Sequence, residues 1–249
     1  MVGNEFVLHV WGDFACFTRP ELKVERYSYP FITPSAARGV FDAILCKPAR
    51  DPTEAQFRWQ VTRIEVLSPP SYIALRRNEV HQDLPALRTI ERWMDGRDQP
   101  SPLLADEMGK GCLRTQRQTM ALRDVRYRLH ARIIPWPRHA DRLHCFEAQF
   151  IRRAAAGKCF YQPYLGCREF PGFFEPVAPD APGPPPCSWD TDDLGLMLYD
   201  VFDLSGPGGP TAPPSVSLFR PVVRGGVVEV PPYESPDVLK PRGAMARDT

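Results

Sequence analysis

The stretch MALRDVRYRLHARII, residues 120–134, alternates apolar and polar side chains through its second half. Successive side chains of a β-strand point to opposite faces of a sheet, so this alternation predicts a strand with one buried face. The apolar set consists of Val125, Tyr127, Leu129, Ala131 and Ile133. The polar set consists of Asp124, Arg126, Arg128, His130 and Arg132. The segment therefore predicts a core strand that also carries arginine on its second face.

Two helices and three further strands are predicted around this strand. Thr33 can accept from free amides at a helix start, Pro34 suits the first helical position, and the second helix ends at Gly157. The strands are expected at residues 5–11, 57–67, 120–134 and after Gly166, and the helices at residues 34–45 and 142–156. This strand–helix–strand–strand–helix–strand order predicts an α+β protein with a ferredoxin-like (RRM-like) βαββαβ domain.

Proline and glycine divide the rest of the chain. We expect the ferredoxin-like domain to occupy residues 1–176, with a long insertion at residues 71–112 that forms its own hairpin or lid. The proline-rich stretch PVAPDAPGPPP, residues 176–186, predicts a stiff linker. Residues 187–230 are expected to form a small antiparallel β-sheet domain, with a hairpin around Gly225 and Gly226. Residues 231–249 are expected to be a flexible tail.

The charge of the chain is unevenly distributed. The net charge of the 249 residues is only +1, yet residues 114–153 contain ten arginines and three acids. Residues 169–249 contain twelve acids and five bases. This asymmetry is typical of a protein with a nucleic-acid face, although a codon bias toward arginine gives the same composition. The arginine face of the strand can hold phosphates, or it can be solvated or covered by the 71–112 insertion.

Other classes of protein find no support in the sequence. No apolar run is long enough for a membrane helix, and the first residues do not form a secretory signal. The seven cysteines form no C-x-x-C pair, which favours reduced thiols and a cytoplasmic location. The histidines lack zinc spacing, and phosphate-loop, dinucleotide and serine-hydrolase motifs are absent. We therefore expect no metal and no cofactor.

Four stretches of the sequence resemble one known family. They are VWGDFACFTRPELKVERYSYP at residues 10–30, TPSAARGVFDAILCKP at residues 33–48, RRNEV at residues 76–80 and YLGCREFP at residues 164–171. In this order they resemble the CRISPR-associated RAMP-superfamily proteins of type I-C systems, from Phe6 to about Val230. The resemblance implies a RAMP fold and a metal-independent endoribonuclease that cleaves repeat hairpins in precursor CRISPR RNA (crRNA).

The resemblance also implies partners. The protein would stay bound to the crRNA 5′ handle beside other subunits of the Cascade effector complex, in antiviral defence, and double-stranded DNA is a further expected partner. An alternative is a non-catalytic subunit that binds the handle structurally while another protein cleaves.

The chemistry of this cleavage determines which types of catalytic residue the protein needs. A base activates the ribose 2′-hydroxyl, a cation stabilises the phosphate charge and an acid protonates the leaving 5′-oxygen, giving a 2′,3′-cyclic phosphate and a 5′-hydroxyl. The family's tyrosine before K-P falls on Leu45, and its Lys-His pair falls on Cys145 and Phe146, beside His144. The catalytic candidates are His144, Tyr29 and Arg117. The RNA-binding candidates are Arg26, Arg38, Arg76, Arg77, Arg114, Arg126, Arg128 and Arg168.

Two of these candidates have a plainer interpretation. His144 can equally be an exposed histidine at a helix start. Arg168 lies in the aromatic stretch YQPYLGCREFPGFF, residues 161–174, which can bind a phosphate or can be a structural loop that closes the first domain.

Overall fold

The central strand of the fold, β5 (Arg114–Pro135), is longer than the sequence pattern predicts. The computed structural model describes residues 3–22, 24–47, 55–80, 85–100, 114–178, 183–208 and 214–241. The chain forms two compact units, the larger from Met1–Ile73 and Met120–Thr249 and the smaller from Ala74–Thr119. The strand β5 contributes residues to both units.

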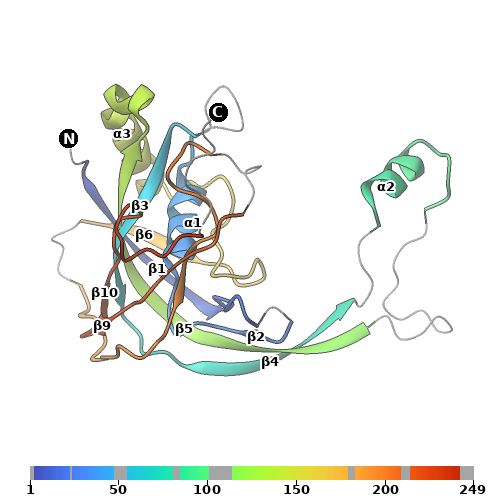
Figure 1. Cartoon of the computed structure of the whole chain (residues 1–249), viewed down its shortest axis with the longest axis horizontal. Helices are drawn as coiled ribbons and strands as arrows, with labels where there is room; N and C mark the ends of the chain where they lie inside the picture. The colour runs from blue at the N-terminus through green and yellow to red at the C-terminus, as the bar shows by residue number, and fades with distance from the viewer. Residues whose placement is uncertain are drawn as a thin grey trace. The chain divides into compact units, whose positions relative to one another are not determined.

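The larger unit contains the predicted ferredoxin-like sheet. Its strands are β1 (Glu5–Ala15), β3 (Phe57–Val66), the second part of β5, and β6 (Phe173–Val177). They pair in the order β6-β1-β5-β3, and every pair is antiparallel. The helices α1 (Pro34–Ile44) and α3 (Leu143–Ala155) connect the strands in the βαββαβ order and lie along the sheet (Figure 1). The predicted α+β fold class is confirmed.

The core lies between this sheet and the two helices. The apolar face predicted for residues 125–133 is buried, with Leu129 and Ala131 fully inaccessible to solvent. Aromatic rings fill the space between helices and sheet: Trp59 of β3 packs on Phe41 of α1 at 4.9 Å and on Phe150 of α3 at 4.7 Å between ring centroids. Close packing of large rings contributes strongly to stability, so this cluster fixes both helices on the sheet.

The start of α1 has the predicted cap. The Thr33 hydroxyl accepts a hydrogen bond from the amide of Ala36 at 3.2 Å, and Pro34 is the first helical residue. This hydrogen bond satisfies one of the amides that a helix start leaves without a partner. At the other end Leu45 leaves the helical conformation and is buried.

Residues 187–230 belong to the larger unit. The strands β9 (Val223–Arg224) and β10 (Val227–Glu229) form the predicted hairpin around Gly225 and Gly226, and β10 pairs with β3. The strands β7 (Met197–Asp200) and β8 (Ser217–Phe219) form a two-stranded sheet of their own. The hairpin therefore extends the main sheet instead of forming a separate one.

The C-terminal segment differs in part from the flexible tail expected at residues 231–249. Tyr233 is buried and donates to Asp203 at 3.1 Å, and the backbone of Leu239 pairs with that of Leu218. Backbone hydrogen bonds from Ser235 to Pro232 and from Val238 to Ser235 form turns in this segment, and the buried Tyr233 ring fixes it to the unit. Residues 242–249 lie outside the described part of the chain.

The smaller unit contains most of the predicted insertion. The strand β4 (Tyr72–Val80), which belongs to this unit from Ala74 onward, pairs with β5, so the hairpin partner of β4 is the extended start of β5. The helix α2 (Leu87–Met94) follows, and none of its residues is buried.

The remaining elements belong to the larger unit. They are β2 (Arg26–Tyr27), which pairs with β5, and the 3-10 helix η1 (Pro137–Arg142) before α3. Within the described ranges, no helix is both long and apolar enough to cross a membrane.

Candidate functional site

The positive charge on the polar face of β5 is partly neutralised by a carboxylate of the neighbouring strand β3. Arg128 donates to Glu65 of β3 at 2.6 Å and to the carbonyl of Pro184 in the proline-rich linker at 3.2 Å. His130 lies 3.0 Å from the other oxygen of the same carboxylate, and both His130 and Glu65 are buried. Removal of one partner from such a network leaves a buried charge uncompensated, so Arg128 has a structural role in joining β3, β5 and the linker.

The other RNA-binding candidates divide by their contacts. Arg126, Arg76 and Arg168 are exposed and form no ion pair with any described residue. Arg26 contacts the Cys167 sulfur at 3.1 Å, and Arg38 is held by two carboxylates. Arg77 has interaction partners, and the side chain of Arg114 lies outside the described part of the structure. The exposed arginines are thus the ones whose charge faces solvent.

Tyr29 is a buried residue with a structural hydrogen bond. Its hydroxyl donates to the carbonyl of Leu196 at 3.3 Å, and the guanidinium of Arg19 lies 4.9 Å from its ring centroid. Burial, together with the negative charge of Glu21, raises the pKa of the Tyr29 hydroxyl. These contacts hold Tyr29 at the wall of a cavity of about 500 Å³ that Arg19 and Arg220 also line.

His144 lies in the first turn of α3 and is exposed. Its Nε2 atom is 3.2 Å from the sulfur of Cys145, which is also exposed. Arg142, two residues before His144, donates to the side-chain oxygen of Gln56. The backbone amide of Gln56 donates in turn to the carbonyl of Lys47, just beyond α1. The start of α3 is thus linked through Gln56 to the segment after α1, whereas Arg153 in the last turn of α3 donates to the carbonyl of Ile44 at the end of α1. The exposed His144 can be approached from solvent.

The positions to which the family pattern points have different surroundings. Leu45 is fully buried, and its carbonyl accepts a hydrogen bond from the Trp59 indole at 2.9 Å. Phe146 is also in the core, with its ring 5.0 Å from that of Phe57. Neither side chain can transfer a proton. Among these positions the structure gives only His144 and Cys145 both solvent access and titratable chemistry.

Tyr29 and His144 lie far apart in the larger unit. The residue before Tyr29 bonds to Met120 of β5, whereas Phe146 near His144 packs on Phe57, which pairs with Pro135 at the far end of the strand. The strand between Met120 and Pro135 spans about 50 Å at about 3.3 Å per residue. Arg117 belongs to the smaller unit and has interaction partners. His144 is thus separated from Tyr29 along the length of β5.

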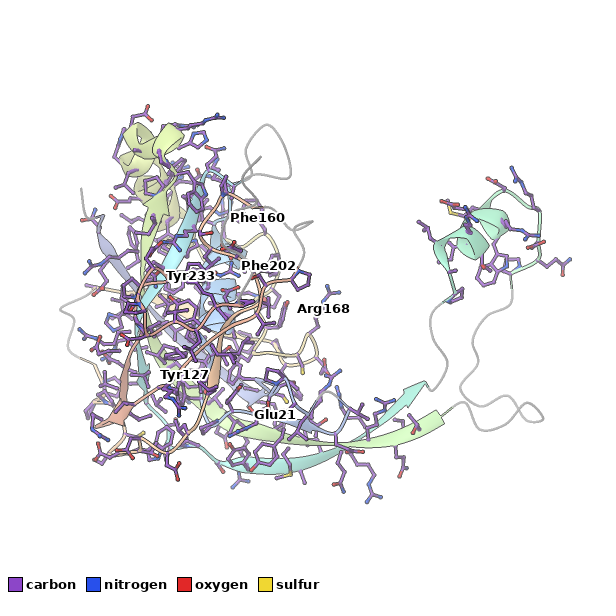
Figure 2. The ribbon with its side chains drawn as sticks, in the orientation of Figure 1. Glu21, Tyr127, Phe160, Arg168, Phe202 and Tyr233 are labelled. Carbon is purple, nitrogen blue, oxygen red and sulfur yellow. The ribbon has the colours of Figure 1, made fainter. Side chains whose placement is uncertain are left out.

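A groove that sequence reasoning missed lies in the larger unit beside α1. It has a volume of about 390 Å³ and is bordered by α1, by residues 161–166 and by residues 198–202. Arg38 joins Asp42 on α1 at 2.5 Å and Asp200 at the end of β7 at 2.7 Å. Phe202 lines the groove, and Arg168 extends outward just beyond residues 161–166 (Figure 2). The spacing of Arg38 and Asp42, four residues apart on one helix, was the signal available in the sequence.

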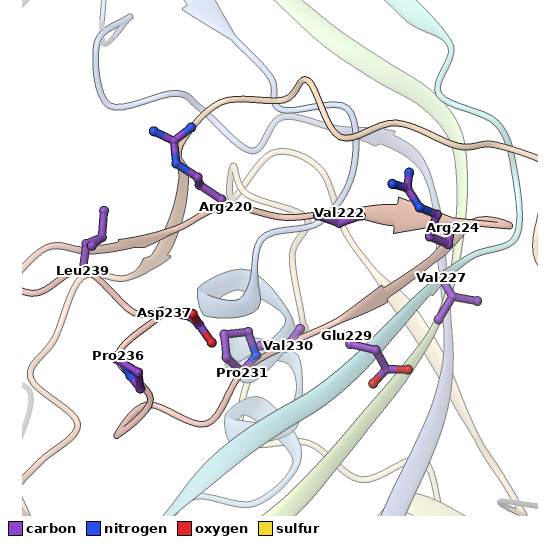
Figure 3. A pocket seen from close by; sticks show the side chains of 10 residues that line it. All are labelled: Arg220, Val222, Arg224, Val227, Glu229, Val230, Pro231, Pro236, Asp237 and Leu239. Carbon is purple, nitrogen blue, oxygen red and sulfur yellow. The ribbon is translucent and has the colours of Figure 1, made fainter.

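A second cavity lies beside the β9–β10 hairpin (Figure 3). Its volume is about 740 Å³, and its charged lining residues are Arg220, Arg224, Glu229 and Asp237. The positive and negative side chains are interspersed, so the cavity does not favour an anion.

The described residues contain no group of three or more histidine, cysteine, aspartate or glutamate side chains that could hold a metal ion. The six cysteines in the described part of the chain are free thiols.

Comparison with known proteins identifies the family. The family model described as CRISPR-associated protein (Cas_Cas5), named Cas_Cas5d, matches residues 6–231. The chain belongs to the Cas5d family. A Cas5d protein from Thermus thermophilus, named CRISPR pre-crRNA endoribonuclease, is 40% identical over 201 residues, 81% of this chain and 75% of that relative. One of the same name from Mannheimia succiniciproducens is 34% identical over 246 residues, 96% of this chain and 100% of that relative.

Solved structures share the fold of this Cas5d family member. A crystal structure of a functionally uncharacterized protein from Streptococcus mutans matches with a TM-score of 0.61 and 20% identity, over 96% of this chain and 98% of that one. The structure of a CRISPR-associated protein matches with a TM-score of 0.60 and 19% identity, over 96% and 97% of the two chains. At these identities the likeness concerns the fold alone, and it agrees with the predicted RAMP fold.

Proposed function

We propose that this protein is an endoribonuclease that cleaves the repeat hairpins of precursor crRNA and then stays bound to the 5′ handle. The observation that carries the proposal is the 34–40% identity, over most of the chain, to two proteins named as pre-crRNA endoribonucleases. The asymmetric charge of the chain and the exposed arginines Arg76, Arg126 and Arg168 support an RNA partner.

We place the chemistry at the start of α3, with His144 as the residue that transfers a proton. The reaction has the ribose 2′-hydroxyl attack the adjacent phosphorus. The bond from phosphorus to the 5′-oxygen breaks, and the proton lost by the 2′-oxygen is balanced by one gained by the leaving oxygen. An exposed imidazole can perform either transfer, and the positive end of α3 stabilises the negative charge that develops on phosphate. Arg138 and Arg142 are cations on the preceding 3-10 helix η1, and Arg142 directly precedes α3.

The partners and the location follow from this role. We propose that the protein binds the crRNA 5′ handle together with other subunits of a Cascade complex, that it works in the cytoplasm, and that double-stranded DNA is a further ligand. Arg117 is proposed as a contact to RNA, and the buried Tyr29 is proposed to hold the wall of the cavity that Arg19 and Arg220 also line.

Incubation with a labelled cognate repeat RNA in excess EDTA tests the function. We expect one discrete cut, with a 2′,3′-cyclic phosphate on the upstream product, because the proposed steps need only side chains of the chain. The product ends are read by treatment with acid and phosphatase. Cleavage that stops on chelation and returns with added Mg²⁺ would contradict the proposed chemistry.

A second function, binding without cleavage, is favoured by Leu45. This side chain is buried at the end of α1, where the family pattern has a group that can donate a proton. In that case the same incubation yields tight binding to the repeat RNA and no product. The two functions therefore give different results in one experiment.

The contribution of the arginine face is tested by substitution of two neighbouring residues. Because Arg126 is exposed, Arg126→Ala should reduce the dependence of log affinity on log salt by about 0.7, the value for one phosphate contact on a single strand. Arg128 is held by Glu65, so Arg128→Ala should lower the melting temperature and change the salt dependence little. Equal effects of the two substitutions on the salt dependence would contradict the assignment of the phosphate contact to Arg126 rather than to Arg128.

A further inference from the structure

The floor of the groove beside α1 is unusually open at the helix surface. Ser35, Ala36 and Gly39 lie along the groove on α1, and a Cβ atom added at Gly39 would meet no atom within 4 Å. Tyr161 and Tyr164 line the groove from the facing loop, with ring centroids 6.5 Å apart, and both rings are exposed. A flat group can therefore lie against the helix with an aromatic ring beside it.

The polar end of the groove has one carboxylate that is less well satisfied than its neighbour. Asp200 accepts from Arg38 and from the amides of Val201 and Phe202. Asp42 accepts only from the Nη1 atom of Arg38, through Oδ2, among the described residues. Its Oδ1 atom and the remaining lone pair of Oδ2 are free to accept further hydrogen bonds. Burial, together with the charge of Asp200, raises the pKa of Asp42. Further N–H donors to Asp42 would stabilise its ionised form and so lower this pKa.

Arg38 itself cannot serve as a phosphate ligand in this groove. Its Nε and Nη2 atoms donate to the two oxygens of Asp200, and Nη1 donates to Asp42. The groove thus offers a carboxylate and aromatic rings, and its arginine is already neutralised. Such a lining suits the base of a nucleotide better than its phosphate. The exposed Arg168, two residues beyond Gly166 at the groove wall, is a cation available outside it.

We propose that this groove binds one unpaired guanine of the RNA, with the base beside Tyr161 and its N1–H and N2–H₂ groups donating to the Asp42 carboxylate. The inference rests on the proposed function, because it requires that RNA reaches the groove. Guanine is the base with two adjacent donors on its pairing edge, whereas adenine and cytosine place an acceptor beside the donor and uracil has one donor between two carbonyls. A volume of about 390 Å³ is at the small end of ligand sites and fits a single nucleotide.

The experiment measures how the protein ranks bases. Fluorescently labelled U8 is compared by anisotropy with the same octamer carrying one central G, A, C or inosine. We expect the G octamer to bind roughly tenfold more tightly than U8, the discrimination of a good bidentate contact. Inosine, which keeps N1–H and lacks the amino group, should fall between the two.

Three variants locate the preference. Asp42→Asn removes the acceptor pair, and Gly39→Leu fills the open floor with a good helix former, so each should reduce the G-to-U ratio to near one. Asp193→Asn removes the same charge at an exposed residue that does not line the groove and should keep the ratio of the unmodified protein. Circular dichroism of Gly39→Leu checks that α1 is intact.

The results separate this inference from the proposed function. Equal binding of all octamers by a protein that still cleaves repeat RNA would overturn the guanine site and leave the function standing. A G preference that survives both Asp42→Asn and Gly39→Leu would also overturn it. A protein that binds neither the octamers nor the repeat RNA would refute the function and the site together.

Discussion

Replacement of His144 by alanine is expected to slow cleavage of the repeat RNA by ~10²–10⁴-fold, the contribution of a positioned proton-transfer group. RNA affinity should change little, because His144 is exposed and its only described contact is the sulfur of Cys145. The melting temperature should be preserved for the same reason. Single-turnover rates with saturating protein measure the chemical step, and a binding isotherm with a non-cleavable 2′-deoxy substrate measures affinity.

His139→Ala is the matched control for this substitution. His139 precedes His144 by five residues in η1, is partly exposed and belongs to the same end of the molecule. Its loss should leave the rate within a few-fold of the unmodified protein. Added imidazole should restore part of the rate to His144→Ala, which a merely structural role would not allow. If His144→Ala cleaves at the normal rate, the proton transfer must be assigned to another residue, of which Cys145 is the nearest exposed one.

Much of the fold could be predicted from the sequence because it depends on patterns among neighbouring residues. Alternation in residues 125–133, the Thr33 cap and the glycine hairpin at Gly225 each depend on neighbours in the sequence, and all three are present in the structure. The extension of β5 back to Arg114 was missed. It depends on pairing with β4, some forty residues earlier, and not on a pattern within the strand itself.

The candidate site was less readable because it depends on register between distant segments. Arg128 looks like an RNA ligand until the β3–β5 register places Glu65 opposite it. The sequence does not show that Tyr29 is buried against the segment around Leu196. Nor does it show that Asp200, far along the chain, binds the same arginine as Asp42. Types of residue could be read from the sequence, and partners could not.

The second large effect is expected at Gly166, where the loop of residues 164–171 meets the end of β1. The φ angle of Gly166 is +86°, and a Cβ atom there would lie 2.0 Å from the carbonyl oxygen of Cys16. The same contact region holds the hydrogen bond from the Cys16 amide to the Leu165 carbonyl at 2.9 Å. Left-handed backbone costs an L-residue ~1–2 kcal/mol, and the overlap with backbone adds about 1–3 kcal/mol. Gly166→Ala should therefore destabilise the protein by about 2–5 kcal/mol.

Gly157→Ala separates the two contributions, because Gly157 also has a positive φ, +62°, but no atom lies within 4 Å of its added Cβ. It should lose only the backbone contribution of ~1–2 kcal/mol. Urea unfolding of both variants beside the unmodified protein gives the difference, which is the cost of the close approach between Gly166 and Cys16. Equal losses at the two glycines would mean that the loop moves away from β1 without penalty. In that case Tyr164, in the same loop, and Tyr161, three residues before it, would not be held against α1, and the guanine preference should weaken in Gly166→Ala as well.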